Sequence, residues 1–352
     1  MVIKHLVISG GYHLFTYILG SLHKLESNDI FDISNIETIW CVSSGSFVAI
    51  CISLLKGYRD KITEDTSDIL LSWDVIEKYI EERPWSYLFI NPSFSIYDII
   101  DKKGIYDEII IHSMIEPFLK LLDLPLTITL EKFYEYTKVE IHFYSFDIYQ
   151  FQMIDISYKT YPNMTLVDAM YVTASVPFLS IPHIEYNKCF IDGGCIINYP
   201  ICYALKRVTN SEEILGYNTQ LTTLTLHEEQ DVSIRNEGIF YYIYFIASTL
   251  YTKIYNTFIC RTENSHTEAV YQDINNINVE DIEVDNKECE YKYYNEINLQ
   301  PLSDDKQSFY NGLIVLFQDF YEFLYSNEKR RYMLENGKGR ITIIKKFFIY
   351  NN

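Results

Sequence analysis

The first 57 residues contain the same pattern two times, an apolar strand followed by a turn and a helix, and this pattern restricts the fold more than any other feature of the chain. Residues 5–9 form a short apolar run that ends in two glycines, and residues 13–26 then carry apolar side chains at helical spacing. Residues 36–42 form a second apolar run, and residues 44–56 are apolar almost all round until Gly57, which reads as a helix stop. A strand–turn–helix unit that occurs twice predicts a parallel α/β sheet with crossover helices.

Later segments continue the alternation of strands and helices. Thr165 and Asp168 have the spacing of a capping box, which predicts the start of a helix. The remaining predictions are strands over 139–148 and 151–157, a hairpin over 183–192, and helices over 200–208 and 313–324.

The strand–turn–helix pattern is not accompanied by an internal sequence repeat, the chain has no clean linker, and 352 residues suit one large domain. We therefore expect residues 1–210 to form the α/β domain and residues 211–352 to form a C-terminal elaboration packed on the same domain. Within that elaboration, residues 238–252 predict a buried or interfacial helix, because the run is too short and too polar to span a bilayer. The acidic, Asn-rich residues 273–290 predict a solvated loop.

The net charge of −19 restricts the partners of the protein. Such an acidic chain disfavours nucleic acid as the main partner and strong attachment to anionic membranes, since both depend on clustered Lys and Arg. The basic cluster at 329–346, followed by the apolar residues 347–350, leaves open a transient contact with a membrane surface.

The seven cysteines show no metal-ligand spacing, and their number is odd. Free thiols in a reducing compartment are the expected state. The N-terminus reads as a first strand and lacks the pattern of a signal peptide. These features together predict a soluble, cytoplasmic protein.

Three short motifs carry candidate chemistry: Gly10-Gly11 after the first strand, Ser43 in 41-CVSSG-45 after the second, and Asp192 in 192-DGG-194. Functional groups gather at the carboxyl ends of parallel strands, so the first two motifs should be neighbours. A serine on a strand-to-helix elbow exposes its hydroxyl at the positive end of a helix. The glycine turn offers backbone N–H groups to an oxyanion, and Asp192 is the candidate base.

Each motif also has a simpler interpretation. Ser43 alone could be a helix N-cap, and Asp192 alone could belong to a turn that ends a hairpin. Gly10-Gly11 could open a nucleotide site, but G-x-G-x-x-G and a P-loop lysine are both missing. His13 could donate to an intermediate or could be a surface or helix-start residue, and His142 on the 139–148 strand is interpreted as structural.

The order of these motifs resembles that of the patatin-like lipid acyl hydrolases, including members from large DNA viruses. The resemblance covers about residues 1 to 208. It rests on the glycine loop and its helix (9-SGGYHLFTYILGSLHKL-25), the elbow, the segment 169-AMYVTASVPFLSIP-182, and 192-DGGCIINYP-200 with its D-G-G and N-x-P.

The resemblance implies a patatin-like three-layer sandwich with a central, mostly parallel sheet between helices. It also implies a Ser–Asp dyad in which Ser43 attacks a lipid ester and Asp192 accepts its proton, with an acyl-enzyme intermediate and no metal or other cofactor. The substrates implied are phospholipids or other lipid esters, and the oligomeric state stays open. The oxyanion and substrate-binding positions are Gly10, Gly11, Tyr12, Ser44 and Gly193.

The chain departs from the family pattern at four positions. Tyr12 replaces the third glycine of the loop, Leu14 its basic residue and Phe15 its last glycine, while Cys41 replaces the first glycine of the elbow. A bulky residue at a position that needs a positive φ is strained. An alternative function therefore follows, in which the protein is a weakly active or inactive relative that binds a lipid or a partner.

Overall fold

The computed structural model describes residues 2–62, 70–89, 100–185, 187–219, 289–298, 318–339 and 343–351. The helix predicted over 238–252 lies outside these residues, as does most of the loop predicted over 273–290, whose last two residues begin a strand.

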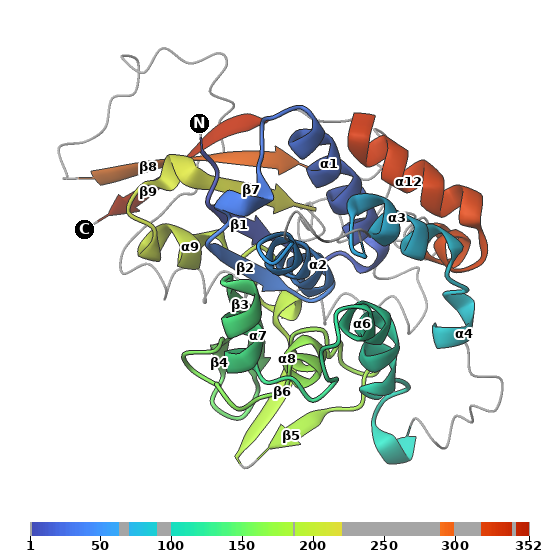
Figure 1. Ribbon diagram of the computed structural model, residues 1–352. Coiled ribbons are helices and arrows are strands. Elements are labelled where there is room, and N and C mark those ends of the chain that lie inside the picture. The colour runs from blue at the N-terminus through green and yellow to red at the C-terminus, as the bar shows by residue number, and fades with distance from the viewer. Residues whose placement is uncertain are drawn as a thin grey trace, which may run out of the picture.

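One sheet forms the centre of the molecule (Figure 1), with the strand order β5-β6-β3-β2-β1-β7-β8-β9 and with β4 paired to β3. The five strands from β3 to β8 in this order are parallel, and antiparallel pairs flank them on both sides. The strands are β1 (His5–Ile8), β2 (Thr38–Val42), β3 (Glu140–Asp147), β4 (Gln152–Ile156), β5 (His183–Glu185), β6 (Lys188–Asp192), β7 (Ile214–Asn218), β8 (Cys289–Asn298) and β9 (Ile344–Asn351).

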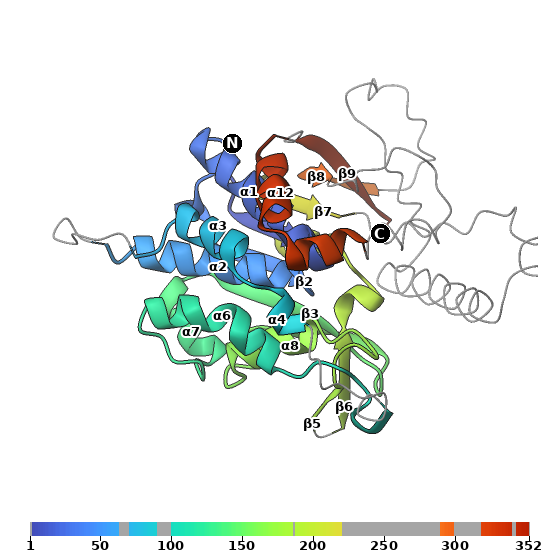
Figure 2. The same ribbon diagram turned by 90° about the vertical axis from the view of Figure 1, so that its right-hand side faces the viewer.

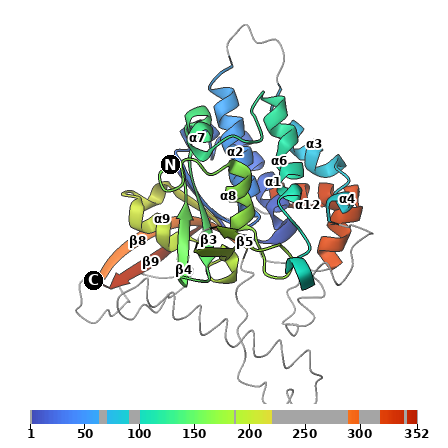
Figure 3. The same ribbon diagram turned by 90° about the horizontal axis from the view of Figure 1, so that it is seen from below.

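Alternating side chains of the central strands face two separate cores. Leu6 and Ile39 face the larger core, which α1 (Phe15–Ser27), α2 (Gly45–Arg59) and α8 (Leu166–Thr173) help to fill. Val7 and Trp40 face a smaller core under α9 (Ile201–Arg207), and Figure 3 shows α9 apart from α2, α6 and α7. The prediction of an α/β sandwich with a central sheet between helices is confirmed.

The remaining described helices lie on the larger core or next to the sheet. They are η1 (Tyr12–Leu14), η2 (Ile33–Asn35), α3 (Trp73–Glu82), α4 (Ser86–Phe89), α6 (Ile109–Leu121), α7 (Leu130–Thr137), η3 (Gly193–Cys195), η4 (Ser211–Glu213) and α12 (Asn327–Gly339), with a further helical stretch over 318–325. Every helix in the described ranges is too short or too polar to cross a membrane.

The expected stop of α2 at Gly57 is wrong, because the helix continues to Arg59. Gly57 instead permits close packing, since an added Cβ would lie 2.9 Å from the Cα of Thr137 at the end of α7. The capping prediction at Thr165 is confirmed, since its hydroxyl accepts a hydrogen bond from the Asp168 N–H at 3.0 Å.

The C-terminal helix α12 lies directly against α1 (Figure 2). The backbones of the two helices come close together at two glycines. A Cβ on Gly20 would lie 2.2 Å from the carbonyl oxygen of Leu334, and a Cβ on Gly337 would lie 2.2 Å from the carbonyl oxygen of Tyr17. Lys338 of α12 also pairs with Glu77 of α3 at 2.8 Å. The division of the chain at residue 210 stays a prediction, although β7 to β9 extend the same sheet.

Candidate active site

Ser43 occupies a sharp elbow between β2 and α2. Its φ of 52° is left-handed, a conformation that costs an L-residue about 1–2 kcal/mol. The Ser43 N–H donates to Thr173 Oγ1 at 3.1 Å, and its carbonyl accepts from the Ser46 N–H at 2.9 Å, so the surrounding structure holds the bend. The N-cap of α2 is Ser44, not Ser43, which excludes the simple capping interpretation of Ser43.

Two glycines allow the neighbouring chain to approach this elbow. A Cβ on Gly45 would lie 2.6 Å from the Ser9 carbonyl oxygen, and a Cβ on Gly10 would lie 2.8 Å from the Cβ of Ser43. The close approach places the glycine loop against the serine, as the order of the motifs predicts.

Asp192 ends β6, and its side chain is 3% exposed. The carboxylate accepts a hydrogen bond from the Gly194 N–H at 2.6 Å. Burial raises the pKa of Asp192 to about 6, against the lowering effects of the nearby Ser43 side chain and of the Gly194 N–H. A carboxyl with this pKa is suited to accept and return a proton near neutral pH.

Strand β3 lies between the two side chains and sets their separation. Val42, next to Ser43, pairs with Tyr144 of β3, and Asp192 pairs with Ser145. The Ser145 hydroxyl also donates to the carbonyl of Ile191 at 2.7 Å. Serine and aspartate, far apart in the sequence, therefore meet because both are in register with adjacent residues of one strand.

The sequence predicts free backbone amides in the glycine loop, but two of these amides already have hydrogen-bond partners. The Gly10 N–H donates to Asn198 Oδ1 at 3.1 Å, and the Gly11 N–H donates to Ser44 Oγ at 3.0 Å. Tyr12 has the φ of 52° that its strained position predicts, and its N–H has no hydrogen-bond partner among the described residues. Of the three predicted oxyanion amides in this loop, the Tyr12 amide is therefore the one still available to a ligand.

The side chain of Tyr12 lies close to the carboxylate. Burial and then the charge of Asp192 raise the pKa of Tyr12 to about 12, so the phenol stays protonated. Gly193 has a packing role, since a Cβ there would lie 2.3 Å from the carbonyl oxygen of Tyr144.

An apolar cavity of about 320 Å³ opens beside Ser43. Its wall comes from the glycine loop, the α8 region, α6 and the helical stretch over 318–325. Lining side chains include Phe15, Trp85, Ile111, Met114, Met170 and Phe323. Ligand pockets are typically apolar with a few polar groups at one end, and here Ser43, Ser44 and Tyr12 supply that polar end.

The motif order, the elbow and the neighbouring carboxylate agree with the comparison to known families. The model of the patatin-like phospholipase family matches residues 6–205, more than half of the chain. The protein belongs to the patatin-like phospholipase family.

Two viral proteins are similar to this patatin-like chain. One is the probable lipid hydrolase 463L of invertebrate iridescent virus 6, which is 28% identical over 206 residues, 58% of this chain and 63% of that protein. The other is the uncharacterized protein R571 of Acanthamoeba polyphaga mimivirus, 28% identical over 202 residues, 56% of this chain and 60% of that protein. The expected resemblance to viral members is confirmed, and the chain matches less than two thirds of each relative.

Two solved structures are more distant. VipD of Legionella pneumophila is 12% identical with a TM-score of 0.38, and the match covers 100% of this chain and 68% of VipD. ExoU of Pseudomonas aeruginosa, solved in complex with SpcU, is 13% identical with a TM-score of 0.33, over 74% of this chain and 53% of that chain.

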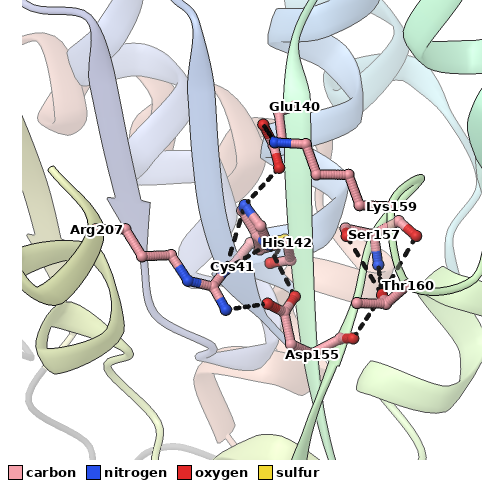
Figure 4. Close-up of polar contacts among 8 residues, drawn as sticks. All are labelled: Cys41, Glu140, His142, Asp155, Ser157, Lys159, Thr160 and Arg207. Atoms are coloured by element: carbon pink, nitrogen blue, oxygen red, sulfur yellow. Dashed lines mark hydrogen bonds and ion pairs between the residues drawn. The ribbon is translucent and has the colours of Figure 1, made fainter.

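A second polar cluster of the patatin-like chain lies on the α9 face of the sheet, away from Ser43 (Figure 4). His142 donates from Nδ1 to the Asp155 carboxylate at 2.8 Å, and its Nε2 lies 3.2 Å from Glu140. Burial opposes the charge of His142, but the hydrogen bonds to these carboxylates outweigh it and raise the pKa of His142. Arg207 pairs with Asp155 at 2.6 Å. This network gives His142 the partners of a structural residue, as predicted.

Cys41 lies between these two regions and is fully buried. Burial raises the pKa of its thiol well above the usual value, so it remains protonated and fills space in the core. The expectation of an inert packing residue at this elbow position is confirmed.

The sequence analysis missed two residues that hold the site. Asn198 binds both polar groups of Gly10, its Nδ2–H donating to the Gly10 carbonyl at 3.2 Å, and Thr173 holds the Ser43 amide. Asn198 lies in the N-x-P motif, which was a signal for its importance but not for its contact. His13 lies in η1, directly before α1, as the helix-start alternative predicts, but it is fully buried, which contradicts the alternative of a surface histidine.

Proposed function

We propose that this protein hydrolyses acyl esters of phospholipids or other lipids through Ser43 and Asp192. The observation that supports it best is the placement of Ser43, which lies on a strained elbow at the wall of an apolar cavity and close enough to the buried Asp192 carboxylate to lower its pKa. The cavity would take the acyl chain and place its ester next to the serine.

The proposed reaction has two steps. Ser43 Oγ attacks the ester carbonyl carbon while its proton passes to Asp192, and the tetrahedral intermediate then expels the alcohol, which takes that proton. Water attacks the acyl-Ser43 ester, Asp192 accepts a proton from it, and the acid leaves as the Ser43 hydroxyl is restored. The Tyr12 N–H and the N-terminus of α2 would stabilise the negative charge on the carbonyl oxygen.

Removing either side chain of the dyad tests the proposal. Ser43→Ala and Asp192→Asn should each lower kcat by at least about 10³-fold on a lipid ester, because nucleophile and base act as a unit. The matched control is Ser53→Ala, which changes another buried serine of α2, whose hydroxyl bonds only its own helix at Ala49. Similar turnover by the wild type and Ser43→Ala would refute the assignment.

One observation favours the alternative, a weakly active or inactive lipid-binding protein. The amides of Gly10 and Gly11 already have partners, so the oxyanion site would depend mainly on the Tyr12 amide. Losing one oxyanion donor typically costs about 10²–10³ in kcat. A fluorophosphonate that labels Ser43 without catalytic turnover would support this alternative.

We also propose where a lipid surface would meet the protein. Ile109 and Phe178 are 64% and 80% exposed, and they adjoin the cavity-lining residues Ile110 and Leu179. Five cysteines are free thiols, namely Cys41, Cys51, Cys189, Cys195 and Cys202, which supports a cytoplasmic location. The contact with the membrane would then be peripheral and transient.

A further inference from the structure

The wall of the acyl cavity contains one polar side chain that the proposed reaction does not use. His13 lines the cavity, is 0% exposed, and has no hydrogen-bond partner at either Nδ1 or Nε2 among the residues that the structure describes. A buried polar group without a partner costs about 1–3 kcal/mol, so such groups usually have a function.

Two aromatic rings flank the His13 imidazole. The ring centroid lies 5.9 Å from that of Phe320 and 6.0 Å from that of Phe323, with interplanar angles of 29° and 28°. Burial lowers the pKa of His13 to about 4, despite the nearby charge of Asp319. The imidazole is therefore neutral at physiological pH and offers one N–H donor and one nitrogen acceptor.

Other polar side chains that line the cavity have partners within the protein. The Tyr106 hydroxyl donates to the Phe89 carbonyl at 2.7 Å, and the Tyr171 hydroxyl donates to the Ile181 carbonyl at 2.6 Å. His13 differs from these residues, since neither of its nitrogens has a partner within the described part of the chain, and the residue lines the cavity.

We propose that His13 determines acyl-chain specificity by hydrogen-bonding an oxygen atom carried on the chain, so that the cavity prefers hydroxylated acyl groups. A hydroxyl suits a neutral imidazole because it can donate to one nitrogen or accept from the other, whichever faces it. The cavity of about 320 Å³ accommodates roughly ten water-sized groups, which corresponds to a chain of about that many carbons. This inference rests on the proposed lipid-ester function for its substrate.

The experiment compares decanoyl esters with their monohydroxylated isomers, each hydroxylated at a different carbon. At least one isomer should show a kcat/KM about five- to tenfold above the plain ester, the value of one neutral hydrogen bond. His13→Phe keeps a flat ring beside Phe320 and Phe323 and should abolish this ratio. His13→Asn, which keeps a donor and an acceptor, should restore part of it.

A second experiment, which measures binding without turnover, separates failure of this inference from failure of the proposed function. In Ser43→Ala, hydroxydecanoic acid should raise Tm more than decanoic acid, and adding His13→Phe should remove the difference. Ester hydrolysis that depends on Ser43 but has no His13-dependent ratio overturns the inference alone. If no ester is hydrolysed, the function fails, and equal or absent Tm shifts by the two acids overturn the inference as well.

Discussion

Two residues at the site are held in the left-handed region although neither is glycine. Ser43 and Tyr12 both have a φ of 52°, and such strain usually persists at functional positions where the surroundings enforce it. At Ser43 the enforcing groups are Thr173 and Ser46. Tyr12 adopts a positive φ, the backbone conformation that glycine adopts most readily.

The pKa of Asp192 predicts the acidic limb of the activity profile. Because the base must be ionised to accept the Ser43 proton, kcat/KM should rise with pH and level off above an apparent pKa of about 6. The measurement is kcat/KM on a soluble ester from about pH 4.5 to 8.5. A profile that is flat across this range would contradict the role of Asp192.

The same pKa has a consequence for stability with a definite sign. The folded pKa of about 6 exceeds the ordinary value of 3.8, so protonated Asp192 favours folding at low pH, and this contribution is lost as pH rises through 6. At pH 8, Asp192→Asn removes a buried charge and should raise the free energy of unfolding by roughly 2 kcal/mol, while activity is lost. At pH 4 the two proteins should be nearly equal.

At the scale of elements, the contact between α1 and α12 depends on backbone approach. Gly337 lies over the carbonyl of Tyr17, and Gly20 lies over that of Leu334, whereas Gly339, two residues further along α12, has no atom within 4 Å of an added Cβ. The two glycines of α12 thus provide a matched pair.

Gly337→Ala should destabilise the protein by about 1–3 kcal/mol, since its Cβ would meet a backbone oxygen that no side-chain rotation can move. Gly339→Ala should be neutral or slightly stabilising, because alanine is the better helix former. Chemical denaturation of both variants, monitored by circular dichroism, measures the difference. Equal midpoints would mean that α12 does not rest on α1 as described.

The sequence predicted the elements that carry the site better than the contacts within it. The β2–α2 elbow and the hairpin before Asp192 follow from local apolar runs and glycine positions, which depend on neighbouring residues only. The engagement of Gly10 by Asn198 joins residues 188 positions apart, and the burial of His13 depends on a helix more than 300 residues away. Such pairings depend on tertiary packing, which periodicity does not encode.

Over the whole molecule, the net charge of −19 opposes contact with anionic lipid. Activity on anionic vesicles should therefore rise as salt increases from about 0.01 M to about 0.1 M, because the Debye length falls from about 30 Å to about 10 Å. Activity on zwitterionic vesicles should change little, since contact there relies on apolar side chains such as Phe178. Turnover measured on both vesicle types across this range provides the comparison, and a salt-induced loss on anionic vesicles would contradict the expectation.

The register of strand β3 with its two neighbours makes activity depend on correct assembly of the sheet. It pairs with β2 beside Ser43 and with β6 at Asp192, so both partners take their positions from consecutive residues, Tyr144 and Ser145. A slip of one residue along β3 would reverse which side chains face the core and carry serine and aspartate out of reach of each other. Turnover would then measure the fraction of correctly folded chains, because a chain with a misaligned sheet would be inactive even if it stayed compact.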